Sequence, residues 1–575
     1  PEVLGPHFLK GLAGEDAIRR AGFSVLVAGH AYGSGSSREV AVDAHRGAGI
    51  ELVVAESLSR IFQENLIYAG LPFTTDLSVV DALRAGGSIP EAELTAGLPP
   101  FFRAVADAGG LLPLGARLMV GETSLSAPSH PGRPMTLAEK LIAENRAPEG
   151  GTGPVRPGDQ VLCRTGFRGL HEYTAGMVAS AYEAAFGDAP VVAPERVACF
   201  EDHFNLLEDP DTPGRVRAAR LGPARRLAEE MRDACRRHGI PLHGPGRALD
   251  AGVCHRLVLE RYAEPGTVVV LTDSHTPTAG VLGTFAFGVG STAMAFALRT
   301  GWVPVTVPST VRVEVEGPAE GGLSPKDLIL HLIGDPWFRE ERWRRSSTDT
   351  CVLELAGAGL DQWDVDELSV LTNMTVEGGL MTGVMVETAP ARRFLEAQGR
   401  GPGRWLAPDP GAEYARVIRV DLSEVPLTVA TPGDARNRAS LDDHAGTPIQ
   451  NVVIASCTGG SLADLRAAAA VLRGRRLAPE VRLTVTPASA AVAEAAQREG
   501  LLEVFSTLGA HVSAPGCGAC IGNGPGVPRP GETTASTTNR NFEGRMGAPG
   551  PVFLVSPAVA AACAATGRLS DPRRI

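Results

Sequence analysis

The chain has 575 residues, of which 44% are hydrophobic and 21% are charged. A chain of this length and composition can bury several cores, which excludes disorder, collagen-like repeats and small disulfide scaffolds. Its 54 basic and 65 acidic side chains leave a net charge of −11, which repels polyphosphate and argues against broad nucleic-acid binding. Only Lys10, Lys140 and Lys326 are lysines, so nearly all the positive charge comes from arginine, the residue suited to bidentate recognition of carboxylates.

The sequence lacks a stretch of about 18 apolar residues, the length that a membrane span requires. The N-terminal region also lacks a basic segment followed by an apolar one, so we expect a cytoplasmic protein. The nine cysteines are too sparse for a secreted disulfide framework. They favour a reducing compartment, where cysteine fills the core, acts as a nucleophile or binds a metal.

Short apolar runs recur along the chain, with segments of helical periodicity after several of them. The runs are Phe23–Ala28, Glu51–Ala55, Thr267–Leu271, Asn451–Ile454 and Val481–Val485, and the helical segments include Leu462–Leu472 and Ala490–Arg498. This alternation predicts an α/β fold with parallel sheets.

The segment 127–134 reads Ala-Pro-Ser-His-Pro-Gly-Arg-Pro. Three prolines and a glycine cannot continue a helix or a central strand, so this segment is predicted to be a linker. We therefore expect a small domain over residues 1–126 and a large domain over residues 135–575. The large domain exceeds the usual size of one folding unit and should have several lobes.

Three cysteines stand in unusual settings. Cys457 follows the expected strand Asn451–Ile454, at an edge where open α/β sheets bind ligands, while Cys517 and Cys520 form a C-x-x-C among glycines. Three thiolates without a fourth suit an iron–sulfur cluster with one open iron. A lone C-x-x-C is also typical of a redox pair, a zinc half-site or buried thiols. The other six cysteines are expected to be buried core residues: Cys163, Cys199, Cys235, Cys254, Cys351 and Cys563.

Five separated motifs together resemble the aconitase and 3-isopropylmalate dehydratase superfamily. They are Gly35-Ser-Ser-Arg-Glu39, Asp273-Ser-His-Thr-Pro-Thr-Ala-Gly280, Ser456-Cys-Thr-Gly459, Pro515-Gly-Cys-Gly-Ala-Cys520 and Ser536-Thr-Thr-Asn-Arg-Asn-Phe-Glu-Gly-Arg545. The resemblance implies an aconitase-like, multi-lobed large domain with parallel sheets around a [4Fe-4S] cluster held by Cys457, Cys517 and Cys520. The small α/β domain resembles the swivel domain, which fused members commonly place last. Here it comes first, so no separate small subunit should be needed.

The resemblance implies a reversible removal and re-addition of water on a hydroxy di- or tricarboxylate. Such a reaction needs a base, an acid, a Lewis acid and clamps for carboxylates. By resemblance, Ser36 is the base, while Ser37 and Arg38 bind a substrate carboxylate. The glycine-rich turn also opens a helix that favours an anion. The alternative is an ordinary serine-rich helix cap.

Aspartates and histidines follow several of the apolar runs. A carboxylate fixes the tautomer of a neighbouring imidazole and raises its basicity, which suits proton transfer. By resemblance, His203 paired with Asp202 delivers the proton of the hydroxyl. Two supporting pairs, His255 with Asp273 and His275 with Glu377, surround the bound hydroxyl or water. The other histidines, apart from His171, are expected to be structural.

The remaining candidates bind substrate by resemblance. Asn373 and Glu377 are four residues apart, hence on one face if their segment is helical, with an ordinary polar face as the alternative. Arg540 and Arg545 form a carboxylate clamp, and Asn539 contacts the cluster or the substrate. His171 is a further substrate-facing residue. Three arginines from two domains would then converge, which requires closure of the small domain over the cluster.

Two departures bear on the substrate. Gly459 stands where family members usually carry asparagine, and Val40 where a histidine often follows the swivel signature. Our leading hypothesis is a hydro-lyase or isomerase of a 2-substituted malate, either isopropylmalate-like or a specialised alkylmalate. The alternatives are an aconitate or homoaconitate hydratase and an isomerase of a phosphorus-bearing malate. A cluster-sensing RNA-binding regulator is the alternative from another class, and the net charge of −11 argues against it.

Overall fold

The computed structural model describes residues 4–30, 32–33, 39–125, 128, 130–147, 153–246, 251–339 and 350–575. The expected base Ser36 and the expected carboxylate-binding residues Ser37 and Arg38 lie outside these described residues.

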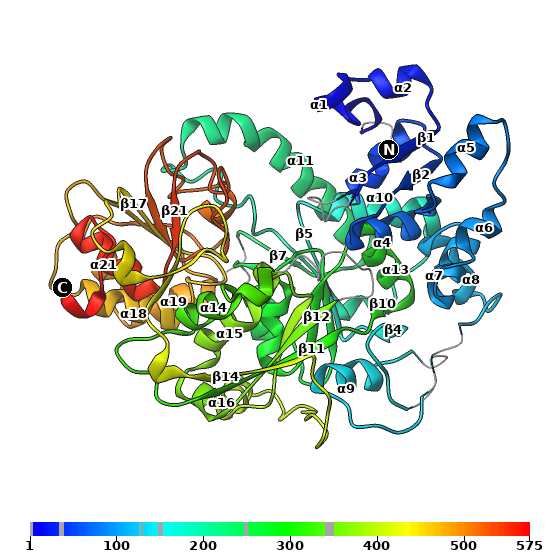
Figure 1. The fold of residues 1–575 in the computed structure, drawn as a ribbon. Helices are drawn as coiled ribbons and strands as arrows, with labels where there is room; N and C mark the ends of the chain where they lie inside the picture. Colours follow the sequence, from blue (N-terminus) through cyan, green and yellow to red (C-terminus); the bar gives the residue numbers. More distant parts are fainter. Residues whose placement is uncertain are drawn as a thin grey trace.

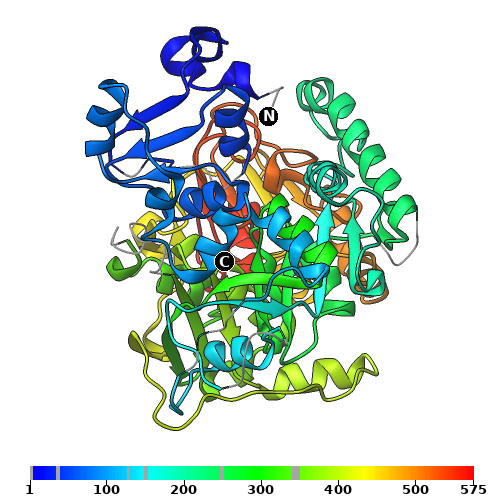
Figure 2. The same cartoon turned by 90° about the vertical axis from the view of Figure 1, so that its right-hand side faces the viewer.

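The N-terminal part, which we define as residues 4–125, contains a three-stranded parallel sheet in the order β1-β2-β3. Its strands are β1 (Val25–Ala28), β2 (Leu52–Ala55) and β3 (Phe73–Thr74), and its longer helices are α3 (Val40–Gly47), α4 (Arg60–Ala69), α5 (Ser78–Arg84), α7 (Pro100–Asp107) and α8 (Leu111–Met119). The first two strands confirm the predicted runs. In Figures 1 and 2, two views at right angles, this part lies on top of the rest of the molecule.

Three larger sheets carry the rest of the chain, and a fourth, two-stranded sheet pairs β4 (Gln160–Arg164) with β10 (Trp302–Thr306). The five-stranded parallel sheet has the order β7 (Leu242–His243), β6 (Val197–Phe200), β5 (Phe167–His171), β8 (Val268–Leu271) and β9 (Phe285–Gly288). The four-stranded parallel sheet has the order β13 (Thr382–Met385), β12 (Cys351–Ala356), β11 (Ser309–Glu316) and β14 (Arg416–Asp421). The inner strands β8 and β12 are buried along their whole length, as is typical of parallel sheets covered on both faces, whereas the edge strand β14 is partly exposed.

The third, seven-stranded sheet lies at the left of Figure 1. Its order is β16 (Arg438–Ser440), β15 (Thr428–Ala430), β21 (Val552–Leu554), β20 (Thr534–Ser536), β17 (Asn451–Ile454), β18 (Arg482–Val485) and β19 (His511–Val512). Its strands are parallel from β21 to β19, and β15 and β16 add an antiparallel edge. The predicted elements Asn451–Ile454, Leu462–Leu472 and Ala490–Arg498 are found with the expected bounds as β17, α18 and α19.

Most of the long helices pack against these sheets. They are α9 (Leu137–Glu144), α10 (Ala175–Phe186), α11 (Gly214–His238), α12 (Cys254–Arg261), α13 (Ser291–Thr300), α14 (Pro325–Ile333), α15 (Val365–Asn373), α16 (Ala389–Ala397), α20 (Leu501–Thr507) and α21 (Pro557–Thr566). Among the described residues, no helix is both long and apolar enough to cross a membrane.

Among the described residues, the N-terminal part contacts the remainder through apolar packing and through a polar contact. Helices α7 and α8 share a buried apolar cluster with α13, in which Phe101, Leu111 and Leu114 lie with Phe296. Glu39, directly after the serine-rich segment, accepts the backbone N–H of Thr292 at 2.7 Å in the first turn of α13. This contact satisfies one of the N–H groups that lack a partner within the helix.

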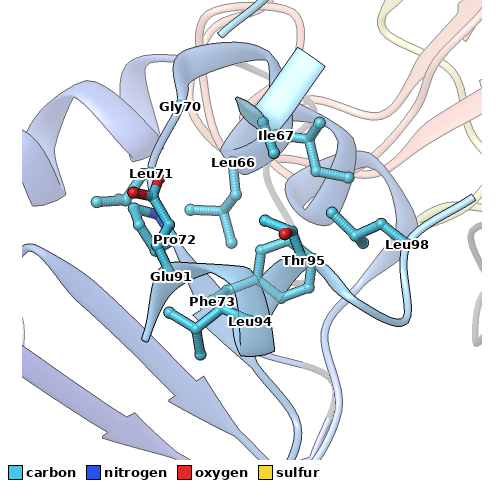
Figure 3. A pocket seen from close by; sticks show the side chains of 11 residues that line it. Leu66, Ile67, Gly70, Leu71, Pro72, Phe73, Glu91, Leu94, Thr95 and Leu98 are labelled. Atoms are coloured by element: carbon cyan, nitrogen blue, oxygen red, sulfur yellow. The ribbon is translucent and has the colours of Figure 1, made fainter. Parts of the chain in front are cut away.

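A small hollow in the N-terminal part is lined mainly by apolar side chains from α4, β3 and the segment 91–98 (Figure 3). Leu66, Leu71, Phe73, Leu94 and Leu98 form most of its wall. Its lining includes none of the candidate residues, so it has no part in the site described next.

Candidate active site

The candidate residues gather at the carboxyl ends of three neighbouring strands of the five-stranded sheet. His171 ends β5, Asp202 lies just after β6, and Asp273 lies just after β8. Because β5, β6 and β8 are parallel, their carboxyl ends meet at the same edge. This edge is the usual ligand-binding position in open α/β sheets.

Asp273 is the centre of this group. Its Oδ1 accepts a hydrogen bond from His255 Nε2 at 2.9 Å and from the backbone N–H of His275 at 2.8 Å. Its Oδ2 lies 3.2 Å from His203 Nε2. Burial alone would raise the pKa of Asp273, but these donors, His255 foremost, hold it well below its usual value. The carboxylate is therefore ionised and orients three histidines.

His203 lies between two carboxylates. Its Nδ1 donates to Asp202 Oδ1 at 2.6 Å, while Nε2 faces Asp273. Burial opposes the charged form of the ring, but Asp202 and Asp273 together hold the pKa of His203 well above its ordinary value. His203 is therefore an imidazolium at neutral pH and carries a proton that it can donate.

His171 stacks on His203, with ring centroids 4.1 Å apart and ring planes inclined by 18°. Its Nε2 lies 3.2 Å from the carbonyl oxygen of Thr272. Burial, reinforced by the adjacent positive charge of His203, lowers the pKa of His171 to about 4. This ring is therefore neutral at neutral pH and can serve as a hydrogen-bonding surface.

Glu172 organises the loop after β6, a role that the sequence analysis did not assign. One carboxylate oxygen, Oε1, accepts the backbone N–H groups of His203 and Phe204 at 2.7 and 2.8 Å. The other, Oε2, accepts the N–H of Asp202 at 3.3 Å. Burial, followed by the charge of Asp202, raises the pKa of Glu172 to about 7.

A second carboxylate joins a histidine to an arginine. Oε1 of Glu377 lies 2.8 Å from His275 Nε2 and 2.8 Å from Arg540 Nε. Arg540 Nη2 also donates to Ser274 Oγ at 3.1 Å. The proposed clamp residue Arg540 is thus oriented by a protein carboxylate.

The conditional helix over Asn373 and Glu377 is not continuous. Helix α15 ends at Asn373, and Glu377 lies in the following 3₁₀ turn, η9 (Met374–Gly378). The tighter turn still directs both side chains to the site, because Asn373 Nδ2 donates to Cys457 Sγ at 3.1 Å while Glu377 contacts His275. Asn373 and Glu377 therefore lie at the same site although they do not share the face of one helix.

The three candidate cysteines come together beside the histidines. Asn539 links two of them: its Oδ1 accepts from Cys520 Sγ at 3.4 Å, and its Nδ2 donates to Cys457 Sγ at 3.7 Å. Cys517 Sγ donates to Asp202 Oδ2 at 3.7 Å. Cys517 is thus in contact with Asp202, the same carboxylate that accepts a hydrogen bond from His203.

The donor set fits an iron–sulfur cluster. Burial raises the pKa of the Cys457 thiol to about 12, and that of Cys517 well above its usual value, so a bound cation is needed to keep them as thiolates. Oδ1 of Asn373 is buried without a hydrogen-bond partner at this point. Ser456, directly before Cys457, has a φ of 82°, a left-handed conformation that is strained for serine and typical of functional sites.

Gly459 is explained by packing. A Cβ at this position would lie 2.0 Å from Thr537 Oγ1, so the threonine fills the space that a larger side chain would need. The same hydroxyl accepts the backbone N–H of Ala455 at 3.0 Å. The glycine therefore allows the loop after β17 to approach the segment after β20.

Arg545 sits beside Phe542, with its guanidinium carbon 5.9 Å from the ring centroid. Its Nε is buried without a hydrogen-bond partner. A guanidinium with an unused donor is suited to receive an anion.

Sequence reasoning missed three contributors. Glu172 and Ser274 lie within recognised segments, yet their roles depend on backbone contacts that spacing does not show. Cys254 is buried as expected, but its backbone N–H donates at 2.7 Å to Asp202 Oδ2, the oxygen that Cys517 also contacts. Its position next to His255 was the available signal.

Comparison with known proteins shows the family. The model of the aconitase family, described as aconitate hydratase, matches residues 164–448 and 443–567. The model of the aconitase C-terminal domain matches residues 15–76, within the N-terminal part. The chain belongs to the aconitase family and is an enzyme of the hydro-lyase type.

Several curated relatives cover most of the chain. The 3-isopropylmalate dehydratase large subunit of Elusimicrobium minutum is 34% identical over 447 residues, 77% of this chain and 99% of the relative. The corresponding large subunit 1 of Pyrococcus furiosus is 36% identical, with coverages of 77% and 99%. The homoaconitase large subunit of Thermus thermophilus is 37% identical, with coverages of 76% and 98%.

Replacing Glu377 tests whether the carboxylate positions its two partners. Glu377→Gln should lower kcat/KM for water elimination by about 10- to 100-fold, because an amide cannot orient His275 and Arg540 together as an anion does. Steady-state kinetics measure the effect. Glu387→Gln, which breaks an exposed pair with Arg392, is the control and should leave kcat/KM unchanged. Equal kinetics in both variants would remove Glu377 from the site.

Proposed function

We propose that this protein reversibly dehydrates and rehydrates a 2-substituted malate, either isopropylmalate-like or a specialised alkylmalate. The observation that carries the proposal is the meeting of thiols and a charged histidine at Asp202, which contacts both His203 and Cys517, while Asn539 links Cys457 to Cys520. The similarity to 3-isopropylmalate dehydratase large subunits over 77% of the chain supports this substrate class.

The proposed cofactor is a [4Fe-4S] cluster held by Cys457, Cys517 and Cys520. Proteins of the aconitase family use iron–sulfur clusters, and the three thiols are the soft donors that such a cluster takes. When bound, the cluster would supply a Lewis acid for the departing hydroxyl. Asn373 and Asn539, which contact the sulfurs, would hold the thiolates in place.

The proton transfers are assigned to this chain's own side chains. His203, held as an imidazolium between Asp202 and Asp273, donates the proton that leaves with the hydroxyl. His255 and His275 are oriented by Asp273 and support the hydroxyl or water. While His203 acts as the acid, Ser36 is proposed as the base that takes the proton from the substrate carbon.

Carboxylates of the substrate would meet positive charge from both parts of the chain. Arg540 is oriented by Glu377, and Arg545 has an unused buried donor. Ser37 and Arg38 are proposed to add contacts from the N-terminal part, with His171 as a neutral neighbour. Charge assembled locally in this way reconciles an anionic substrate with a net charge of −11.

The N-terminal part is proposed to replace a separate small subunit. The relatives are named as large subunits, whereas this chain also contains the match to the aconitase C-terminal domain at residues 15–76. The contact of Glu39 with α13 attaches that part directly to the cysteine-bearing part. We propose a small domain over residues 1–126, a linker over residues 127–134 and a large domain over residues 135–575. Helices α7 and α8 of the small domain would then pack against α13 of the large domain.

The substrate is tested with a panel of 2-substituted malates, together with citrate, homocitrate and a phosphorus-bearing malate. The anaerobically reconstituted enzyme should form the unsaturated product fastest from an alkyl-substituted malate, as followed by ultraviolet absorption. Preferential turnover of citrate or homocitrate would contradict the proposed substrate but keep the reaction class. Absence of turnover across the panel would contradict both.

The cluster is tested with Cys517→Ser. This variant should lose cluster iron and activity together, because serine does not replace a soft thiolate ligand. Iron and sulfide analysis after anaerobic reconstitution, with an absorption spectrum, gives the readout. Cys563→Ser removes another buried thiol, which lies in a separate core cluster, and should retain both cluster iron and activity. Full iron content in Cys517→Ser would refute the ligand assignment.

The base is tested with Ser36→Ala. The variant should keep its cluster but lose exchange of the substrate's carbon-bound proton with deuterated water, by about 100-fold or more for a general base. Proton exchange is followed by nuclear magnetic resonance. Ser78→Ala, at the start of α5, serves as the control. Normal exchange in Ser36→Ala would assign the base elsewhere.

A further inference from the structure

Lys326 is an unusual residue in this chain. It is one of three lysines among 54 basic residues, and its side chain is only 2% exposed. It occupies the second position of α14, where a positive charge is unfavourable because the helix dipole is positive at that end. A buried cation in such a place needs compensation from specific partners.

Those partners are backbone carbonyls next to the site. The Nζ of Lys326 donates to the carbonyl oxygens of Thr537 and Thr538 at 2.9 and 2.7 Å. The next residues along the chain are Asn539, which contacts two of the cysteines, and Arg540, which contacts Glu377. The ammonium therefore fixes the backbone from which both side chains extend.

The same contact reaches the first cysteine loop. The carbonyl of Thr537 also accepts the hydroxyl of Thr458 at 2.8 Å, so the oxygen is shared between Lys326 and the residue after Cys457. A compact ammonium can bind two adjacent carbonyls, whereas the wide, planar guanidinium of arginine would need more room. This explains a lysine in a chain that otherwise uses arginine.

The charges that face the ammonium come from several elements. They are the carboxylates of Asp464 and Glu377 and, when they are ionised, the thiols of Cys457 and Cys520. Burial lowers the pKa of Lys326 to about 8, while these groups, Asp464 first, favour the charged form. The side chain is thus largely protonated at neutral pH.

We propose that Lys326 is a positioning residue that aligns Asn539 and Arg540. We also propose that its positive charge offsets the negative charge of the cluster and its cysteine ligands. The positioning role rests on the observed contacts with the carbonyls of Thr537 and Thr538. The electrostatic role, which we call the electrostatic half of the proposal, rests on the proposed function because it requires the cluster. Lys326 touches neither substrate nor cluster in this role. It acts through the segment after β20 and through its charge.

The test compares Lys326→Met with Lys140→Met, which removes a partly exposed lysine paired with Asp409. Lys326→Met should bind malate about 10- to 100-fold more weakly, measured by calorimetry on the protein as purified, because Arg540 loses its backbone support. In the reconstituted protein, the cluster's reduction potential should fall, since reduction adds negative charge that the ammonium no longer offsets. Lys140→Met should match the unmodified protein in both measurements.

Asp464→Asn is a second variant, which should shift the cluster's reduction potential in the opposite direction. Asp464 faces Lys326 and caps α18 through Ser461, and asparagine retains an acceptor for that cap. Loss of its negative charge should raise the cluster's reduction potential. A merely structural role for Lys326 predicts no such pair of opposite shifts. If Lys326→Met does not fold, as judged by circular dichroism, the shift in Asp464→Asn decides the electrostatic half.

Unchanged malate affinity and unchanged potential in Lys326→Met would overturn the proposal, as would an unchanged potential in Asp464→Asn when Lys326→Met cannot be measured. Failure of the proposed function gives a different result. In that case the unmodified protein and Lys140→Met would both fail to take up iron and sulfide, while the malate measurement would still report whether Lys326 supports Arg540.

Discussion

The site depends on one largely buried carboxylate, that of Asp273, whose side chain is 14% exposed. A carboxylate cannot remain ionised away from water unless hydrogen-bond donors surround it, and here His203, His255 and the backbone of His275 supply them. Each donor comes from a different element. The hydrogen bonds to Asp273 therefore fix the positions of α12 and of the loops after β6 and β8 relative to one another. The charged state of His203 then follows from its position between Asp273 and Asp202.

The cysteine side of the site faces the opposite problem. Buried thiols favour the protonated form, and the raised pKa values of Cys457 and Cys517 express that preference. A bound cation reverses it, and the surrounding amides of Asn373 and Asn539 are donors to sulfur in either state. The two halves of the site meet at Asp202, which contacts both His203 and Cys517. Asp202 therefore connects the histidine pair to the group of thiols.

Membership of the aconitase family places the reaction among hydro-lyases, and the fused N-terminal part distinguishes this chain from relatives named as large subunits. The attachment of that part combines apolar packing on Phe296 with a contact from Glu39 to α13. Burial raises the pKa of Glu39 to about 7, so its contribution to this attachment varies with pH near neutrality. As a raised carboxyl pKa favours the folded form at low pH, ionisation should weaken the attachment as the pH rises through that value.

The sequence by itself determined the α/β class and several strands and helices to within two residues. Through the family resemblance of its motifs it also pointed to the histidine–carboxylate pairs and to the cysteines, which lie together in the structure. Periodicity and motif order depend only on the order of residues in the chain, so both can be read from the sequence without a structure. Tertiary structure alone decided that Glu377 orients Arg540, that Thr537 makes Gly459 necessary, and that Lys326 is buried behind the cysteines. Lys326 and Thr537 are more than two hundred residues apart in the chain. Their contact arises only when α14 packs beside the seven-stranded sheet, because the partners of a buried charge are set by folding and not by spacing.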